Sequence, residues 1–346
     1  MVRYFKSDNT APVAPQILAA IAAANDGFAR GYGDDPWSQR LDARFSKLFE
    51  RDVRVFPLVT GTAANTLALS TLVPPYGAIL VHEEGHIVRD ECGAPEFMTG
   101  GARLMLMQGP GAKVTPEAMA ALLAANPASV HTVQPRALSL TQATEFGTVY
   151  TPGELQTITT LARRRGLVVH MDGARFANAV ASLGCSPAEV TWRAGIDVLS
   201  FGATKNGALT AEAVVFFDPV QAADFEFRRK RAGHLLSKMR FVSAQLLAYL
   251  EDDLWLRLAA RANGLAARLG RAAAGRLLHP VEANEVFVRL GEHHIAALRA
   301  LGFDFYDWGA EGSGEARLVV SWNQPEDDVD ALCAALSALD SEPRPS

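Results

Sequence analysis

The feature that most constrains the fold is the alternation of short apolar runs with amphipathic stretches over the first two thirds of the chain. We expect strands at 53–59, 79–82, 130–134, 167–172, 197–202 and 213–217. Between them, the 3.6-residue periodicity predicts helices at 63–72, 116–125, 152–165 and 174–183. This alternation is typical of βαβ units, so we expect a mostly parallel sheet buried on both faces by helices.

The pattern changes from about residue 235 onward. Stretches rich in Leu, Ala and Arg predict helices within 246–276. After them we expect two strands and two helices in alternation, at 286–290, 293–301, 317–321 and 327–339. We therefore predict an N-terminal arm and large domain at 1–245 and a small α+β domain at 246–346. The last six residues, SEPRPS, are expected to be loose.

Charge and cysteine usage exclude several classes of protein. A net charge of −5 over 346 residues gives no basic excess, so nucleic acid is not an expected partner. Cys92, Cys185 and Cys333 are far apart and form neither a disulfide framework nor a metal-ligand spacing. We expect a reducing, cytoplasmic location and no metal. No apolar run is long enough to span a bilayer, and the first residues lack the apolar core of a secretion signal.

Lys205 lies in the segment DVLSFGATKNG, residues 197–207, where an expected strand ends in a turn flanked by Gly202 and Gly207. Ligands of open α/β sheets bind at the carboxyl ends of the strands. A lysine in that position can form a Schiff base with the aldehyde of a cofactor. A solvated loop lysine is the alternative, and the segment alone favours that alternative.

Asp172 ends a second expected strand, in LVVHMDGARFAN at 167–178. A carboxylate there can hold the proton of a pyridinium nitrogen and so keep the ring electron-poor. Gly173 allows close backbone approach, and Arg175 lies within one helical turn of the same crevice. Taken alone, Asp172 is equally well explained as the N-cap of the next helix.

A third segment, LVTGTAAN at 58–65, passes from a strand through Gly61 into a helix whose first turn contains Thr62. The free N–H groups and positive end of such a helix bind phosphate. An ordinary turn capped by Thr62 is the alternative, and the motif is weak alone. A phosphate site, a strand-end Asp and a strand-end Lys in this order together predict a pyridoxal-phosphate (PLP) site.

The sequence resembles the L-threonine aldolases of the β-eliminating-lyase group, within PLP fold type I. The matching motifs occur in family order and span nearly the whole chain. They are SDNTAPVAP at 7–15, YGDDPW at 32–37, TGTAAN at 60–65, HMDGARFANA at 170–179, SFGATKNGA at 200–208, SKMRFVSAQ at 237–245 and ARLVVSW at 316–322. The resemblance implies a large domain with a mixed, mostly parallel seven-stranded sheet, and a smaller C-terminal α+β domain.

The resemblance also implies roles for cofactor-binding residues. Lys205 is similar to the lysine that carries the cofactor, and Asp172 to the partner of the pyridine nitrogen. Gly61 and Thr62 resemble the phosphate cradle, to which Arg240 adds a charge-assisted contact. The cofactor implied is pyridoxal 5′-phosphate.

For the substrate, Ser7, Arg175 and Arg317 resemble the residues that bind its carboxylate, and an arginine fork suits that group. Tyr32 is expected to contact the site of a neighbouring subunit, in a homodimer or homotetramer with active sites at the interface.

His86, in HEEGH, resembles the histidine that stacks on the cofactor ring near the substrate hydroxyl. A surface loop histidine is the alternative for His86, and His82 is an alternative candidate for the role itself. Glu91 follows at the family's spacing and is expected to support the pocket. Where many members have Asn-Thr-His-Asn, this chain has LSLTQATEFG at 138–147, with Gln142, Thr144 and Glu145 but no histidine. We expect His86, or a water that it holds, to take the hydroxyl proton, but the missing histidine leaves the identity of this base open.

The activity implied is cleavage of L-threonine, L-allo-threonine or related β-hydroxy-α-amino acids such as phenylserine to glycine and an aldehyde. Another PLP enzyme of this fold, an aminotransferase or a β-eliminating lyase, is the first alternative, since the scaffold does not fix the chemistry. A cofactor-binding protein without catalysis is the second alternative. The presence of both Lys205 and Asp172 argues against it.

Overall fold

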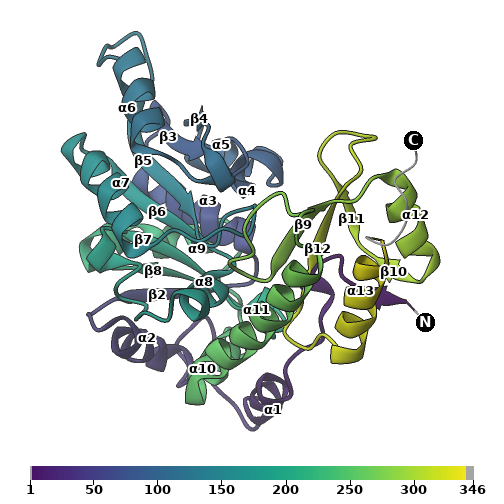
Figure 1. The fold of residues 1–346 in the computed structure, drawn as a ribbon. Helices are drawn as coiled ribbons and strands as arrows, with labels where there is room; N and C mark the ends of the chain where they lie inside the picture. Colours follow the sequence, from purple (N-terminus) through teal and green to yellow (C-terminus); the bar gives the residue numbers. More distant parts are fainter. Residues whose placement is uncertain (1, 340–346) are drawn as a thin grey trace.

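The structure is a computed structural model that describes residues 2–339. It consists of a large sheet wrapped by helices and a smaller sheet with its own helices beside it (Figure 1). The tail expected to be loose lies outside the described residues. Within 2–339, no helix combines the length and apolarity needed to cross a membrane.

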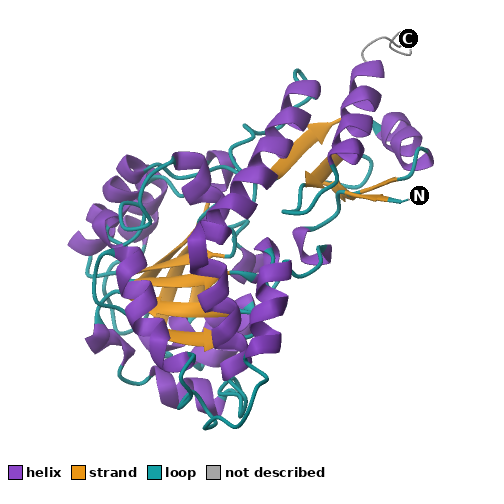
Figure 2. Cartoon of the chain, turned by 90° about the horizontal axis from the view of Figure 1, so that it is seen from below, coloured by secondary structure: helices purple, strands orange, loops and turns teal. Residues whose placement is uncertain are grey.

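The large sheet has seven strands in the order β2-β8-β7-β6-β5-β3-β4. Six strands run in the same direction and β8 runs opposite to them, so the sheet is mixed but mostly parallel. The strands are β2 (Arg54–Leu58), β3 (Gly77–His82), β4 (Arg103–Met107), β5 (Gln134–Thr141), β6 (Val168–Gly173), β7 (Val198–Gly202) and β8 (Glu212–Phe216). The sheet lies inside a shell of helices (Figure 2). The apolar runs of β3, β7 and β8 are buried on both faces.

Two groups of helices cover the faces of this sheet. On one face, α3 (Gly61–Leu72) and α9 (Phe225–Arg231) pack with apolar side chains of β2, β7 and β8. The other face packs against a larger cluster with several interlocking aromatic rings, including Phe45, Phe176 and Phe201. Its helices are α1 (Pro15–Ala23), α2 (Leu41–Phe49), α6 (Pro116–Ala125), α7 (Pro152–Arg164), α8 (Phe176–Leu183), α10 (Arg240–Leu250) and the first part of α11 (Leu254–Ala272). Two short helices, α4 (His86–Arg89) and α5 (Ala94–Thr99), follow β3.

The smaller sheet is antiparallel, in the order β11-β12-β9. Its strands are β9 (Glu285–Arg289), β11 (Tyr306–Trp308) and β12 (Glu315–Val319), with α12 (Glu292–Ala300) and α13 (Glu326–Ala338) packed nearby. Near the N-terminus, β1 (Arg3–Tyr4) pairs with β10 (Phe303–Asp304), and Phe5 joins the apolar cluster of this region. The helix α11 contributes to both clusters. The N-terminal segment thus packs against the C-terminal part of the chain, while the division at 245/246 stays a prediction.

Most of the expected elements are present, but one expected strand is wrong. Residues 130–133 form a turn, and the strand begins at Gln134 and runs through the apolar Leu138 and Leu140. Val130 is 98% exposed, because it lies in the turn before the sheet rather than in it.

Candidate active site

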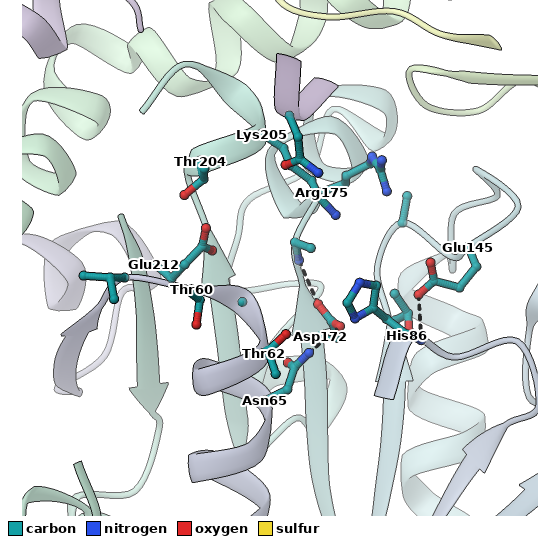
Figure 3. Close-up of a pocket in the computed structure, with 16 residues that line it drawn as sticks. Thr60, Thr62, Asn65, His86, Glu145, Asp172, Arg175, Thr204, Lys205 and Glu212 are labelled. Carbon is teal, nitrogen blue, oxygen red and sulfur yellow. Dashed lines mark hydrogen bonds between the residues drawn. The ribbon is translucent and has the colours of Figure 1, made fainter. Parts of the chain in front are cut away.

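A cavity of about 260 Å³ opens at the carboxyl ends of β5, β6 and β7, beside the N-terminus of α3. Figure 3 shows that Thr60, Thr204 and Glu212 lie at one end of this cavity and His86 and Glu145 at the other. Asp172 lies between the two ends. We call the end with Thr60, Thr204 and Glu212 the hydroxyl-rich end, and the end with His86 and Glu145 the histidine end.

Lys205 and Asp172 line the same cavity, as the order of the sequence motifs predicts. Asp172 is near the end of β6, and Lys205 is in the short 3-10 helix at 204–206 that follows β7. The two strands are adjacent and parallel, with Asp172 opposite Ser200. Gly173 keeps them close, since a Cβ there would lie 2.7 Å from the Ser200 carbonyl oxygen. Both side chains can therefore act on one ligand.

The Asp172 carboxylate is fixed by two hydrogen bonds. Its Oδ1 accepts from the backbone N–H of Ala174 at 3.0 Å, and its Oδ2 accepts from Asn65 Nδ2 at 2.7 Å. Asn65 lies on α3, one helical turn beyond the glycine of TGTAAN, so the helix expected to bind phosphate also positions the aspartate. The motif contained Asn65, but its role could not be read from the sequence because the contact joins residues 107 positions apart.

His86 is linked to Asp172 through buried polar groups. Its Nδ1 lies 2.9 Å from Glu91 Oε1, which also accepts from Asn65 Nδ2 at 2.9 Å. The hydrogen bond from Glu91 raises the pKa of His86, whereas burial raises the pKa of Glu91 itself. His82 is different: it is buried and contacts the Gly109 carbonyl oxygen, and it does not line the cavity. The structure therefore favours His86 over His82 as the histidine of the site.

Gly61 and Thr62 line the hydroxyl-rich end at the start of α3. The Thr60 hydroxyl caps this helix by accepting from the backbone N–H of Ala63 at 3.2 Å. A helix N-terminus with hydroxyl groups around it is suited to a phosphate. Glu212, at the start of β8, lies at the same end and sequence reasoning missed it. Burial raises the pKa of Glu212 to about 7, so this carboxyl is only partly ionised near neutral pH.

Arg175 lines the cavity, but its guanidinium is already paired. It donates from Nε and Nη2 to the two carboxylate oxygens of Asp8, at 2.8 and 3.0 Å, and lies 3.4 Å from Glu285. Ser7 caps the short helix that contains Asp8, and its Oγ accepts from the backbone N–H of Asn9. Asn9 rather than Ser7 lines the cavity. Of the expected carboxylate-binding residues discussed so far, Arg175 lines the cavity and Ser7 does not, and Arg175 is held by an aspartate that sequence reasoning missed.

Three other residues expected at the site do not line the cavity of this chain. The guanidinium of Arg317, on β12, lies over the rings of Tyr306 and Trp308. Arg240 donates to the Gly27 carbonyl oxygen at 3.2 Å. Tyr32 is 55% exposed, with the Lys230 ammonium over its ring. One chain does not bring these three side chains to the cofactor pocket.

The pocket fits pyridoxal phosphate by its donor set. A lysine amine, a carboxylate fixed by hydrogen bonds and a helix N-terminus converge on one cavity, and these are the partners of an aldehyde, a pyridinium and a phosphate. Among residues 2–339, no group of three or more His, Cys, Asp or Glu side chains is placed to hold a metal ion.

Comparison with known proteins identifies the family of the chain. The family model described as beta-eliminating lyase matches residues 4–293. A low specificity L-threonine aldolase from Pseudomonas sp. (strain NCIMB 10558) is 47% identical over 339 residues, which is 97% of each chain. Its counterpart from Pseudomonas aeruginosa is 48% identical, with 92% of each chain covered.

Among solved structures, a threonine aldolase from Leishmania major superposes with a TM-score of 0.91 at 29% identity, covering 97% of this chain and 99% of that one. An N-succinyldiaminopimelate aminotransferase from Thermus thermophilus, at 16% identity and a TM-score of 0.72, shares the fold alone. The chain belongs to the beta-eliminating lyase family and, within it, resembles the low-specificity L-threonine aldolases.

Proposed function

We propose that this protein cleaves L-threonine, L-allo-threonine or related β-hydroxy-α-amino acids such as phenylserine to glycine and an aldehyde, with pyridoxal 5′-phosphate as cofactor. The observation that carries the proposal is the convergence of Lys205, Asp172 and the N-terminus of α3 on one cavity. The similarity of nearly the whole chain to two Pseudomonas L-threonine aldolases supports the same chemistry.

Each of these residues has a distinct task. The amine of Lys205 would hold the cofactor through its aldehyde. Asp172, fixed by Asn65 and Ala174, would keep a proton on the ring nitrogen. The first turn of α3, with Gly61 and Thr62, would bind the phosphate. When bound, the cofactor supplies the electron sink for the pair released at Cα.

Orientation of the substrate selects which bond breaks. The bond aligned with the electron sink is the one that is cleaved, so the groups that fix the substrate carboxylate determine the reaction. Arg175 lines the cavity and pairs with Asp8 through Nε and Nη2, and it is the guanidinium we assign to that carboxylate. Ser7 and Arg317 are assigned to the same group; the charge of Arg317 already acts on Glu285, the carboxylate that contacts Arg175.

Tyr32 and Arg240 are proposed to act in the site of a second subunit. Both lie outside this chain's cavity, and the loop before Tyr32 also exposes Phe28 completely. Exposed aromatic side chains are enriched where subunits meet. A homodimer or homotetramer with active sites at the interface explains both observations. We also propose a cytoplasmic location, from the three isolated cysteines.

The test of the activity is a cleavage assay without any keto acid, on L-threonine, L-allo-threonine, both phenylserine diastereomers and D-threonine. Glycine and aldehyde should appear in equal amounts from the L substrates. An aminotransferase would need a keto-acid acceptor, and a β-eliminating lyase would release ammonia.

Lys205→Ala tests the assignment of the cofactor lysine. The substitution should abolish turnover and the visible absorbance of lysine-bound cofactor. Lys47→Ala, which changes an exposed lysine on α2, is the matched control and should alter neither. Full turnover by Lys205→Ala would show that the lysine is misassigned.

A further inference from the structure

Glu145 lies at the histidine end of the cavity, in the loop that joins β5 to α7. Its Oε1 accepts from the backbone N–H of His86 at 3.1 Å, so the carboxylate is beside the histidine expected near the substrate hydroxyl (Figure 3). The cavity continues from there toward Asp172 and Lys205. Glu145 belongs to the segment 138–147, where many family members have Asn-Thr-His-Asn and this sequence has no histidine.

The loop that contains Glu145 is held by hydrogen bonds on both sides. Thr144 and Thr148 both donate from their hydroxyls to the Gly111 carbonyl oxygen, at 2.9 and 2.7 Å. Gln142 donates to the backbone carbonyl of Tyr150 at 2.9 Å and accepts from its N–H at 3.0 Å. These contacts fix the loop before any substrate arrives, and a fixed acid–base group is what proton transfer requires.

At the histidine end of the cavity, Glu145 and His86 are the acid–base groups without another task. Lys205 is assigned to the cofactor aldehyde, Asp172 to the ring nitrogen and Arg175 to the substrate carboxylate. The hydrogen bond with Glu91 raises the pKa of His86, which shifts its ring toward the protonated form, whereas Glu145 is a carboxyl group. The groups facing Glu145 are Asp172, which disfavours its charge, and His86, Lys205 and Arg175, which favour it.

We propose that the Glu145 carboxylate accepts the β-hydroxyl proton of the substrate during Cα–Cβ cleavage. The O–H bond breaks, and its electron pair forms the C=O of the aldehyde. The pair of the Cα–Cβ bond stays with the glycine fragment, which later takes up one proton at Cα. Glu145 returns its proton to solvent, so no oxidant or reductant is needed. The assignment rests on the proposed function and names the base for its central step.

Burial raises the pKa of Glu145 to about 7, which places it where a general base is most effective near neutral pH. The base form is needed, so cleavage should increase as pH rises through about 7. Glu212 has a pKa of about 7 as well, but it lies at the hydroxyl-rich end and is the matched buried control for the pH profile.

The experiment compares Glu145→Gln, Glu145→Asp and Glu83→Gln. Glu83 is the control: its carboxylate lies outside the cavity and accepts a hydrogen bond from Gln108. Glu145→Gln should lower kcat/KM for L-threonine cleavage by about 10²–10⁴-fold and remove the rise near pH 7. Glu145→Asp should recover part of the rate. In the same proteins, glycine affinity and exchange of its Cα proton with deuterium should change less than about threefold, because glycine has no hydroxyl.

His86→Phe and Glu212→Gln complete the design. Residue 86 holds Glu145 by its main-chain N–H, so the Phe variant keeps the anchor, and both variants should keep the rise near pH 7. Cleavage by Glu145→Gln within threefold of wild type, or equal losses in cleavage and glycine exchange, would overturn the assignment. If wild type exchanges the glycine proton but does not cleave threonine, the proposed function itself is wrong.

Discussion

The buried ion pair between Asp8 and Arg175 connects the N-terminal segment to the start of α8 and holds the arginine assigned to the substrate. Asp8 is 2% exposed and Arg175 is 8% exposed. Asp8 receives two hydrogen bonds from the guanidinium and a third from Asn284 Nδ2 at 3.1 Å. Burial works to raise the pKa of Asp8, but Arg175 and Lys205 hold it below its ordinary value, so the carboxylate is charged.

Asp8→Asn keeps the shape of the side chain and removes its charge. Breaking a buried pair by changing one partner costs about 3–5 kcal/mol, because the remaining charge stays buried. In the variant, Arg175 still has the Glu285 carboxylate 3.4 Å away. We therefore expect the unfolding free energy to fall by about 3 kcal/mol, the lower end of this range. The freed guanidinium should also change KM for L-threonine. Urea unfolding followed by tryptophan fluorescence, with activity measured on the same preparations, tests both effects.

The matched control is Asp34→Asn, which removes the same charge from an exposed pair. Asp34 lies 3.0 Å from Arg30, with side chains 54% and 81% exposed. Exposed pairs contribute about 0–1 kcal/mol, so the control should shift the unfolding free energy by well under 1 kcal/mol. Equal losses in the two variants would refute the idea that the pair at Arg175 anchors the N-terminal segment.

Three further predictions concern the polar network of the site. Asn65→Leu removes the amide shared by Asp172 and Glu91 and should weaken cofactor binding about 5- to 150-fold, the equivalent of 1–3 kcal/mol, as an absorbance titration would measure. Glu91→Gln should lower the pKa of His86, since burial then acts unopposed by Glu91; an unchanged value by NMR titration would contradict this. Burial holds the pKa of His170 at about 4, so this residue should lower stability by about 2–3 kcal/mol between pH 6.5 and 4.5, where only the unfolded chain gains its proton. Glu145 and Glu212, each with a pKa of about 7, act in the opposite direction, so the measurement is the difference in pH slope between wild type and His170→Gln in urea unfolding.

The sheet could be predicted where apolar runs are bounded by turn residues. The helix expected at 116–125 begins and ends as expected, and the strand before Lys205 lies within one residue of its expected limits. The antiparallel direction of β8 could not be predicted, because an apolar run buried on both faces has no direction in its composition. The pairing of β1 with β10 was also hidden, since it joins the two ends of the chain.

In the site, sequence reasoning was strongest at strand ends and weakest at long-range polar contacts. Asp172 and Lys205 follow adjacent strands, so their convergence follows from the topology alone. Asp8 and Glu285 reach Arg175 from distant parts of the chain, and no spacing indicates such contacts. For Tyr32, Arg240 and Arg317 the opposite happens: the sequence predicts a place at the site that the structure of one chain does not show. Their motifs match the family, but the fold of one chain leaves them outside the cavity.

The protonation states of this pocket follow from burial rather than from residue type. Glu145 and Glu212 are both carboxyl groups with a pKa near 7, and they lie at opposite ends of the ligand's space. At the hydroxyl-rich end, Glu212 is partly protonated near neutral pH and so repels an anion less than an ordinary carboxylate would. At the histidine end, a carboxyl that ionises near neutral pH can exchange a proton with a substrate hydroxyl. Aminotransferases share the fold, so the acids at the two ends, more than the sheet that supports them, define what this pocket can do.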